Sequence, residues 1–310
     1  MIRFSPVCRC SPCTRWPPVR GPTTSISGQP ERPGRTPGHW HPPSPRCAGI
    51  SVSTRRRRRS PGRTPPHALS LTSPNPTRSG ELVHRPETGP LATIEGGLIV
   101  SCQAPPDDPM SGPGVMAKMA ATVVAAGARA VRVEGLDDLR AVRAAVDVPV
   151  VGLWKVGNDG VYITPTVDHA LAVAATGAEI VALDATARPR PDGRSLAETV
   201  AAVHEKTPAL VMADISSYDE GVAAVEAGAD VIATTLAGYT MHDAVPDGPD
   251  LALLTALARD LPVPVVCEGR ISTPRAAGAA RRAGAFAVVV GTAITRPHVI
   301  AAGFVEAVEE

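Results

Sequence analysis

A carboxylate and two glycine turns lie close together near the C-terminal end of this sequence. Glu268-Gly269-Arg270 follows one short apolar run, and Gly291-Thr292 follows the next. Turns of this kind after buried strands expose backbone N–H groups, which are natural ligands for a phosphate group. A carboxylate beside such a site can take up or release a proton during a reaction. The spacing therefore predicts a phosphorylated ligand held next to an acid/base group.

Lys155 is a second candidate for proton transfer, because it follows an apolar run over residues 150–154. Side chains alternate along a strand, so Lys155 faces inward at the end of its strand if Trp154 faces outward. Burial and nearby cations lower the pKa of a lysine in such a place, which allows it to act as a base near neutral pH. The alternative is a solvated surface residue, which a single lysine after a strand usually is.

Other polar residues follow the remaining apolar runs: Gln103, Arg132, Asp184, Asp214, Thr234, Thr235 and Arg296. No carboxylate partner for Arg132 or Arg296 is evident in the sequence, and a buried arginine without one is costly. We therefore expect these two residues to face an anionic or polyhydroxyl ligand. Asp214 is interpreted as functional, whereas Asp184 fits a functional role and a loop-fixing role equally well.

Eight short apolar runs alternate with Ala-rich helical stretches from residue 98 onward. The predicted strands cover residues 98–102, 130–133, 150–154, 180–183, 210–213, 231–233, 263–267 and 287–290. The predicted helices lie near residues 113–126, 136–145, 166–176, 195–206, 217–227, 249–259, 273–283 and 298–308, and a short helix is expected after Gly291-Thr292. Because the strands are almost continuously apolar, we expect a parallel sheet that is covered on both faces.

The helix-to-strand connections repeat with the period of two such units. A Gly-Ala pair closes every second helix, at residues 127–128, 177–178, 228–229 and 284–285, and prolines occupy the connections between them. Eight strand–helix units with this fourfold repeat predict a single (β/α)8 TIM barrel, whose active site lies at the carboxyl ends of the strands. A doubly wound open sheet is the alternative, but the first strand is not followed by a GxGxxG turn.

The first ninety residues differ sharply in composition from the rest of the chain. They hold fifteen arginines, three acidic residues and 18 of the 33 prolines. Such a segment cannot bury enough apolar surface to offset the entropy of ordering. We therefore predict a disordered basic tail over residues 1–90 and the barrel domain over residues 91–310. Because no methionine lies between Met1 and Met110, a start site assigned too far upstream is an alternative explanation of the tail.

Composition also bears on partners and location. The arginine run at residues 55–59 could neutralise nucleic-acid phosphates, but few aromatic residues accompany it, so nucleic acid is not expected as a partner. The sequence lacks an apolar run of membrane-spanning length and the apolar stretch of a signal peptide, so no membrane partner is expected. The tail cysteines do not match the spacing of a zinc site, and Cys102 and Cys267 lie in predicted strands as buried thiols. We therefore expect a reduced, cytoplasmic protein.

Several short segments carry a resemblance to a known family. They are GGLIVSCQA (96–104), YITPT (162–166), ALDAT (182–186), RPDG (190–193), MADIS (212–216), TTLAGYT (234–240), EGR (268–270) and VVVGTAITRP (288–297). In this order they resemble the N-acylglucosamine-6-phosphate 2-epimerases, also called N-acetylmannosamine-6-phosphate 2-epimerases, of bacterial sialic-acid catabolism. The resemblance covers residues 96–308. It implies interconversion of N-acetyl-D-mannosamine 6-phosphate and N-acetyl-D-glucosamine 6-phosphate, without a redox cofactor or a metal.

The resemblance also implies roles for individual residues. It places the catalytic base on Lys155 and a second acid/base on Glu268. It assigns Gln103, Arg132, Asp214 and Arg296 to the sugar and its acetamido group, and Gly238, Gly269, Arg270, Gly291 and Thr292 to the phosphate. The segment over residues 156–160 is short and glycine-bearing, so its contacts are left open. A homodimer is left open as well.

Epimerisation at C2 requires groups of this kind. The C2 proton is acidic only when C1 is an aldehyde, so the sugar ring must first open, and Glu268 can assist by moving a proton between O1 and O5. Lys155 then removes the C2 proton, and nearby cations stabilise the enediol-like anion. Rotation about the C1–C2 bond lets the same base return the proton to the other face. A two-base scheme, with Glu268 opposite Lys155, stays open.

Other phosphate-binding barrels are the nearest alternatives: a ribulose-phosphate 3-epimerase, a thiazole synthase or an indole-pathway enzyme. The first would need metal-binding His and Asp residues at strand ends, and none of the barrel histidines ends a predicted strand. Nucleic-acid binding through the tail is an alternative of another class. An inactive barrel that serves as a scaffold is disfavoured, because Lys155, Glu268 and Arg296 are all present.

Overall fold

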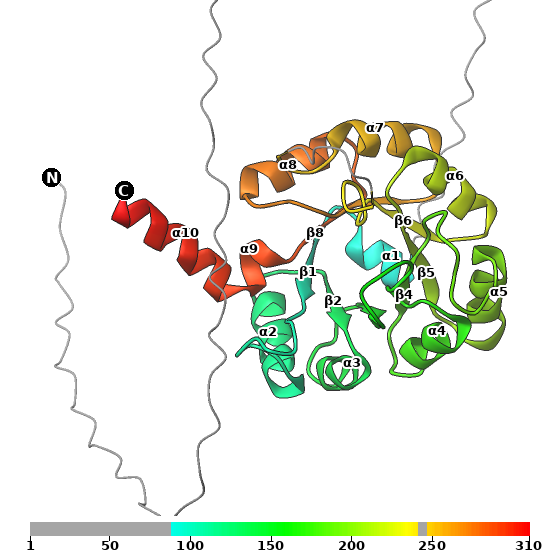
Figure 1. The fold of residues 1–310 in the computed structure, drawn as a ribbon, viewed down its shortest axis with the longest axis horizontal. Coiled ribbons are helices and arrows are strands. Elements are labelled where there is room, and N and C mark those ends of the chain that lie inside the picture. Colours follow the sequence, from blue (N-terminus) through cyan, green and yellow to red (C-terminus); the bar gives the residue numbers. More distant parts are fainter. Residues whose placement is uncertain (1–87, 241–246) are drawn as a thin grey trace, which may run out of the picture. The chain divides into compact units, whose positions relative to one another are not determined.

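The part of the chain that the structure describes folds into a closed barrel of parallel strands (Figure 1). The structure is a computed structural model and describes residues 88–240 and 247–310. The strands, in barrel order, are β1 (Leu98–Cys102), β2 (Ala130–Glu134), β3 (Val150–Leu153), β4 (Ile180–Asp184), β5 (Leu210–Asp214), β6 (Val231–Ala233), β7 (Val265–Cys267) and β8 (Ala287–Val290). Because β8 pairs with β1, the barrel closes and the predicted TIM-barrel fold is confirmed. The predicted tail lies, up to residue 87, outside the described residues.

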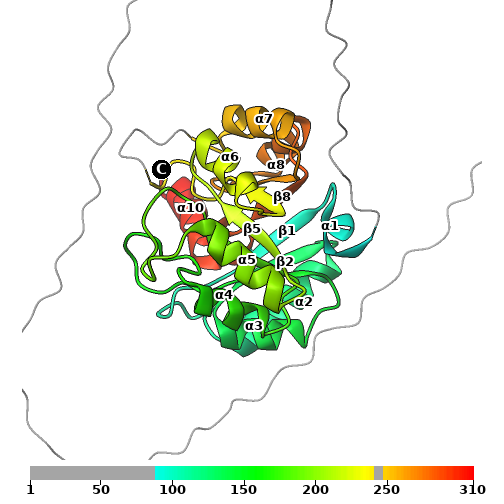
Figure 2. The same cartoon turned by 90° about the vertical axis from the view of Figure 1, so that its right-hand side faces the viewer.

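Helices cover the outer face of the barrel (Figures 1 and 2). They are α2 (Pro113–Ala125), α3 (Leu136–Arg143), α4 (Val167–Ala174), α5 (Leu196–Lys206), α6 (Tyr218–Glu226), α7 (Leu251–Asp260) and α8 (Pro274–Arg282). Polar residues fix where several of them begin. The side chains of Thr166, Ser195, Ser217 and Thr273 each accept a hydrogen bond from a backbone N–H of the first turn. These caps satisfy N–H groups that would otherwise have no partner within the helix.

Two apolar cores follow from the alternation of side chains along each strand. Ile99, Leu153 and Met212 belong to a core inside the barrel. Cys102 and Cys267 belong to a second core, which lies between the strands and the helices. Both cysteines are free thiols and are buried, as the sequence predicts. Burial raises the pKa of Cys102 to about 12 and that of Cys267 to about 11, so neither thiol is a reactive thiolate at neutral pH.

The same alternation places polar side chains directly above the inner core. Residues two apart share a face of the sheet, so Arg132 follows Ala130 inside the barrel and Asp214 follows Met212. The register pairs Ser101 of β1 with Arg132 of β2. A polar layer therefore begins one step beyond the last inner apolar side chains, at the carboxyl ends of the strands.

A short helix, α1 (Gly89–Ile94), precedes the first strand and was not predicted from the sequence. Ile94 is fully buried in the inner core, and Leu91 packs against that core. The N–H of Gly96 donates to the carbonyl of Phe286 at 2.8 Å, which ties the connection to β8. A six-residue helix is too short to show helical periodicity in a sequence, so only the barrel makes it recognisable. It begins ahead of the predicted domain boundary at residue 91.

Strand β7 begins at Val265 and is therefore two residues shorter than the predicted run over residues 263–267. Proline has no N–H, so Pro262 and Pro264 cannot donate to a neighbouring strand. The carbonyl of Pro264 still accepts from the N–H of Ile232 at 3.0 Å. The two prolines therefore set the start of the strand without separating it from β6.

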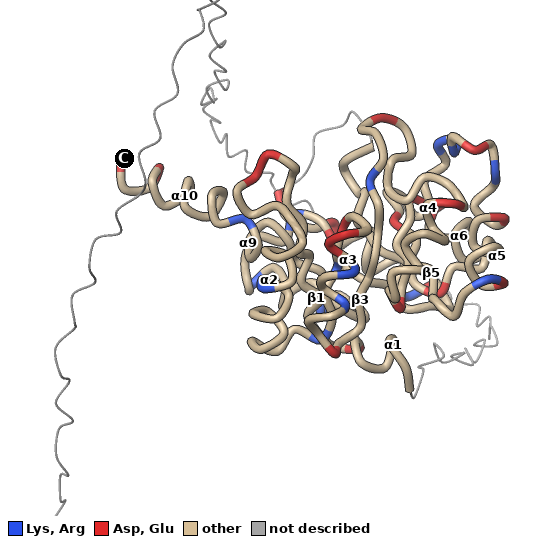
Figure 3. The backbone as a smooth tube through the Cα atoms, turned by 90° about the horizontal axis from the view of Figure 1, so that it is seen from below, with Lys and Arg blue, Asp and Glu red and all other residues tan. Residues whose placement is uncertain are grey.

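The chain ends in two helices after β8, namely α9 (Thr292–Thr295) and α10 (Pro297–Glu309). Helix α10 leaves the ring of outer helices (Figure 1), and in this described segment none of its residues is buried. Few residues of α10 are charged along most of its length (Figure 3). Within residues 88–240 and 247–310, every helix is too short or too polar to cross a membrane.

Candidate active site

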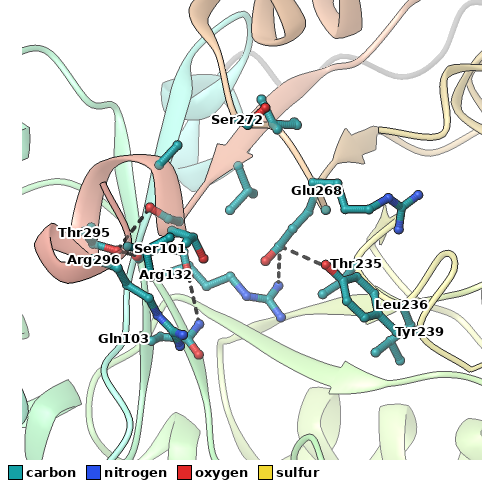
Figure 4. Close-up of a pocket in the computed structure, with 18 of the residues that line it drawn as sticks. Ser101, Gln103, Arg132, Thr235, Leu236, Tyr239, Glu268, Ser272, Thr295 and Arg296 are labelled. Carbon is teal, nitrogen blue, oxygen red and sulfur yellow. Dashed lines mark hydrogen bonds and ion pairs between the residues drawn. The ribbon is translucent and has the colours of Figure 1, made fainter. Parts of the chain in front are cut away.

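A cavity of about 790 Å³ opens at the carboxyl ends of the strands, where the fold predicts an active site. Most of the predicted site residues line it: Gln103, Arg132, Lys155, Glu268, Gly269, Arg270, Gly291, Thr292 and Arg296. Figure 4 labels Gln103, Arg132, Glu268 and Arg296 among them. Asp214 and Gly238 are not among the residues that line it. The barrel thus gathers the predicted lysine, carboxylate and glycine turns around one cavity.

Arg132 lies almost fully buried at the cavity and pairs with two carboxylates. Its Nη1 and Nη2 atoms donate to Oδ1 and Oδ2 of Asp214 at 3.1 and 2.6 Å. Nη1 also lies 3.1 Å from Oε2 of Glu268. The expectation that Arg132 has no carboxylate partner is therefore wrong, because β5 and the residue after β7 supply two. Among the described residues its Nε atom has no hydrogen-bond partner.

Asp214 lies behind Arg132 and is fully buried. Both of its carboxylate oxygens bind the guanidinium group, and Oδ1 also accepts a hydrogen bond from the Thr235 hydroxyl at 2.6 Å. Asp214 therefore orients Arg132. Its assignment as a direct ligand of the sugar stays a prediction.

Lys155 extends from the end of β3 into the cavity, as the alternation with Trp154 predicts. The Trp154 ring packs edge-on against His169 of α4, with 4.7 Å between ring centroids, so it faces the outer helices. The Nζ atom of Lys155 donates to Oε1 of Gln103 at 2.7 Å. The other end of that amide, Nε2, donates to the Ser101 hydroxyl at 2.9 Å. Gln103, which directly follows β1 and is itself held by Ser101, thus fixes the position of the lysine amine.

The surroundings of Lys155 lower its pKa, although the side chain is open to the solvent in the cavity. Desolvation by the cavity walls is the main cause, and the positive charges of Arg132 and Arg296 add to it. The negative charges of Glu134 and Glu268 act in the opposite direction. A lowered pKa increases the neutral fraction of the amine, which is the form that can accept a proton.

Glu268 shows the opposite change, because its pKa is raised. Burial is the main cause, and the nearby carboxylate of Asp214 adds to it. Arg132, the Thr235 hydroxyl and Lys155 oppose the rise. The cavity therefore holds a lysine that loses its proton more readily than usual and a carboxyl group that keeps its proton longer. Such a divergent pair is typical of acid/base sites.

Two of the glycines predicted for phosphate, Gly269 and Gly291, line the cavity. Gly269 has a φ of +107°, a conformation that other residues rarely adopt. A Cβ at Gly291 would come within 3.2 Å of Ser101 Cβ, so a side chain there would crowd β1. Arg270 already has contacts within the protein. Its Nε atom donates to the carbonyl of Gly248 at 2.8 Å, and its guanidinium lies 5.6 Å from the Tyr239 ring centroid.

Asp184 fixes a loop and does not line the cavity. Its Oδ1 atom accepts hydrogen bonds from the backbone and hydroxyl of Thr186 at 3.0 and 2.7 Å, and Oδ2 accepts from Arg188 at 2.6 Å. Buried Arg190 donates to the carbonyl oxygens of Asp184 and Thr164. Of the two roles open for Asp184, these contacts support the loop-fixing one.

Several cavity residues were not assigned a role from the sequence. Ser101 lies two residues before Gln103, so the alternation along β1 could have identified it. Tyr162 enters the cavity because Ile163 forms an antiparallel bridge with Lys155, a contact without a local sequence signal. In the described part of the chain, no cluster of three or more His, Cys, Asp or Glu side chains is arranged to hold a metal ion.

Replacement of Arg132 by methionine should strongly destabilise the fold. The change leaves two carboxylates, Asp214 and Glu268, without their buried cation, and such a loss costs about 3–5 kcal/mol. Urea unfolding at neutral pH measures it. Arg140→Met is the matched control, because Arg140 is exposed on α3 and its pairing with Asp137 contributes little. A loss below about 1 kcal/mol for Arg132→Met would show that the buried network is not needed for stability.

A closed parallel barrel with a lysine, a carboxyl group and glycine turns at the carboxyl ends of its strands defines a TIM-barrel enzyme. Residues 116–310 match the sequence model of the family described as "NanE: Putative N-acetylmannosamine-6-phosphate epimerase". The chain belongs to this family of epimerases. The resemblance seen in the sequence motifs is thereby confirmed.

Individual relatives agree with this assignment. The "Putative N-acetylmannosamine-6-phosphate 2-epimerase" of Cutibacterium acnes is 53% identical over 219 residues, which are 70% of this chain and 96% of the relative. The relative of the same name from Caldanaerobacter subterraneus is 48% identical over 223 residues, 71% of this chain and 94% of the relative. The solved N-acetylmannosamine-6-phosphate 2-epimerase of Clostridium perfringens has a TM-score of 0.68 and 39% identity, and the match covers 72% of this chain and 98% of that chain.

Proposed function

We propose that this chain interconverts N-acetyl-D-mannosamine 6-phosphate and N-acetyl-D-glucosamine 6-phosphate by proton removal and return at C2. One observation carries the proposal beyond family membership. Lys155, with a lowered pKa, and Glu268, with a raised pKa, line one cavity at the carboxyl ends of the strands. A base and a proton donor in one site are what ring opening followed by C2 deprotonation requires.

The roles of the site residues are part of the proposal and are those that the resemblance to the family implies. Lys155 is the base at C2, and Glu268 moves a proton between O1 and O5 during ring opening. Gln103, which contacts the Lys155 amine, and Arg296 bind the sugar and its acetamido group, with Arg132 held towards them by Asp214. The phosphate binds along Gly238, Gly269, Arg270, Gly291 and Thr292.

The reaction has three steps in this scheme. The ring opens and exposes an aldehyde at C1, which makes the C2 proton acidic. The neutral amine of Lys155 takes that proton, and the electron pair moves to the C1 oxygen to give an enolate with the acetamido group on C2, whose charge Arg132 and Arg296 stabilise. C1–C2 is a double bond in this anion, so the rotation that turns the other face of C2 towards Lys155 takes place about C2–C3. The ammonium of Lys155 then returns a proton to that face. One base is sufficient, because the same ammonium serves both faces.

Conversion of the sugar phosphate tests this function. The purified chain is incubated with N-acetylmannosamine 6-phosphate and, separately, with N-acetylmannosamine, and the products are separated by anion-exchange chromatography. We expect N-acetylglucosamine 6-phosphate from the first sugar and a rate at least about 10²-fold lower with the second, because the phosphate anchors the substrate. The absence of product from the phosphorylated sugar would reject the function, and equal rates would reject the phosphate site.

We propose that a second copy of this chain covers helix α10. Phe304, Val305 and Val308 are 71%, 53% and 84% exposed, which is unusual for large apolar side chains on one helix. The first turn of the same helix lines the cavity through Val299 and Ile300. An uncovered apolar helix that also borders the site favours a homodimer.

Phe304→Asp should convert the dimer to a monomer, since it places a charge in the apolar contact. Sedimentation velocity measures the mass of the species in solution. Glu306→Ala, on the same exposed helix, is the control and should leave the dimer intact. A wild-type chain that sediments as a monomer at all concentrations would contradict the homodimer.

Location and domain organisation are proposals of the same kind. The buried free thiols Cys102 and Cys267 are consistent with the reducing conditions of the cytoplasm, and we place the protein there. We also propose that residues 91–310 form the epimerase domain on their own. Activity of a chain that begins at residue 88, which keeps α1, would support this division.

A further inference from the structure

Two adjacent threonines follow β6, and neither has a role in the reaction as described so far. Backbone pairing between β6 and β7 ends where the N–H of Thr234 donates to the carbonyl of Val266 at 3.2 Å. Beyond that point the Thr234 hydroxyl takes over. It accepts from the N–H of Glu268 at 3.1 Å and donates to the carbonyl of Glu268 at 2.9 Å. One side chain therefore satisfies both backbone groups of Glu268.

Thr235 contacts the side chain of the same glutamate. Its Oγ1 atom lies 2.6 Å from Oδ1 of Asp214 and 3.3 Å from Oε2 of Glu268. A hydroxyl has only one proton, so it can donate to one of the two carboxyl groups at a time. When the proton points to Asp214, the contact with Glu268 is a hydrogen bond only if Glu268 is protonated and donates. When Glu268 is ionised, the hydroxyl can rotate and donate to it instead.

The charges around Glu268 make its ionisation sensitive to which carboxyl group the Thr235 hydroxyl donates to. Arg132 from β2 and Lys155 from the end of β3 bring positive charge towards it, and Asp214 of β5 brings negative charge. Asp214 occupies both outer nitrogens of the Arg132 guanidinium, so Glu268 shares a cation that is already paired. A single hydroxyl proton therefore affects how easily Glu268 becomes a carboxylate.

We propose that Thr234 and Thr235 are positioning residues for Glu268: Thr234 fixes its backbone, and the Thr235 hydroxyl stabilises its carboxylate state by donating to Oε2. The inference rests on the proposed function only for the step in which Glu268 transfers a proton to or from the sugar. Figure 4 shows the arrangement, with Thr235 and Arg132 both directed at the Glu268 carboxyl group.

The hydroxyl of Thr235 can be removed with little change of shape by Thr235→Val. The variant removes the hydroxyl that Glu268 Oε2 and Asp214 Oδ1 share, whereas Asp214 keeps both contacts with Arg132. Loss of a hydrogen bond to the charged form disfavours that form. We therefore expect the pKa of Glu268 to move upward in Thr235→Val and to stay at the wild-type position in Thr235→Ser, which keeps the hydroxyl.

Infrared difference spectroscopy without substrate tests this expectation. The C=O band of neutral Glu268 is identified as the band that Glu268→Gln lacks, and the pH at which it disappears is followed over the whole pH range in which the protein stays folded. A higher midpoint in Thr235→Val, restored in Thr235→Ser, supports the proposal. An unchanged midpoint in Thr235→Val, or an equal change in Thr235→Ser, would overturn it. Thr255→Val on the exposed face of α7 is the control for loss of a threonine hydroxyl.

A second measurement separates this inference from the function. The pH profile of kcat/KM for the sugar phosphate should shift in Thr235→Val in the same direction as the infrared midpoint, and Thr235→Ser should follow the wild type. Turnover with an unshifted profile would overturn the inference and leave the function intact. Absence of turnover in the wild type would reject the function, while the substrate-free titration would still be readable. If Thr235→Val does not fold, as judged by circular dichroism, Thr235→Ala gives the same comparison.

Discussion

Replacement of Lys155 by alanine should abolish exchange of the C2 proton of N-acetylmannosamine 6-phosphate with deuterated water. Lys155 is the proposed base at C2, so its removal should cost the general-base contribution, roughly 10²–10⁴-fold. Proton NMR of the sugar measures the loss directly, since the C2 signal disappears when deuterium replaces hydrogen. We expect the signal to persist in the variant under conditions where the wild type removes it within minutes.

The fold should be unaffected by this change, because Lys155 is exposed to the cavity and its amine bonds only to Gln103 among the described residues. Thermal unfolding of Lys155→Ala should match the wild type. Lys206→Ala at the exposed end of α5 is the matched control and should retain full exchange. Exchange at the wild-type rate in a folded Lys155→Ala protein would remove Lys155 from the mechanism.

Replacement of Glu268 by glutamine should cause the second large loss, at least about 10²-fold in kcat with the cyclic sugar phosphate. The amide has nearly the same shape but cannot take up or release the proton that ring opening requires. Steady-state kinetics measure the effect. Slow C2 exchange should persist, because the open-chain form that arises spontaneously still meets Lys155. Turnover at the wild-type rate would exclude Glu268 from the reaction.

Stability provides a check on the same variant. The folded state raises the pKa of Glu268, so ionisation is less favourable in the folded chain than in the unfolded one. The contribution of Glu268 to stability is therefore fully present below its unfolded pKa and is lost as the pH rises through its folded pKa. Relative to wild type, Glu268→Gln should gain stability as the pH rises through that range. Glu205→Gln, which is exposed on α5, is the control for removal of a carboxyl group.

The barrel could be predicted because its strands and turns are local features. Apolar runs mark the strands, and Gly-Ala pairs close alternate helices, so eight units could be counted without a structure. The end of each strand was then enough to predict Lys155 and Glu268 as residues of one site, since parallel strands in a barrel end at one face. The alternation of Trp154 and Lys155 was predictable for the same reason.

Contacts between distant strands could not be predicted in this way. Arg132 seemed unpaired because its partners, Asp214 and Glu268, come from strands on the other side of the barrel. The contacts of the Thr234 and Thr235 hydroxyl groups with Glu268 can be recognised only when β6 is known to lie beside β7. Helix α1 is recognisable only from the burial of Ile94 in the inner core. In each case the missing information is which strand ends face each other, and a sequence does not contain it locally.

The wild-type reaction in deuterated water, started separately from each epimer, tests most directly whether the chain epimerises C2 through proton removal. Proton NMR follows the C2 signals of both sugar phosphates over many turnovers. The proposed mechanism predicts that each epimer is formed from the other and that deuterium accumulates at C2 of both. Failure of either epimer to form, or inversion in which the original hydrogen stays on C2 throughout, would contradict it.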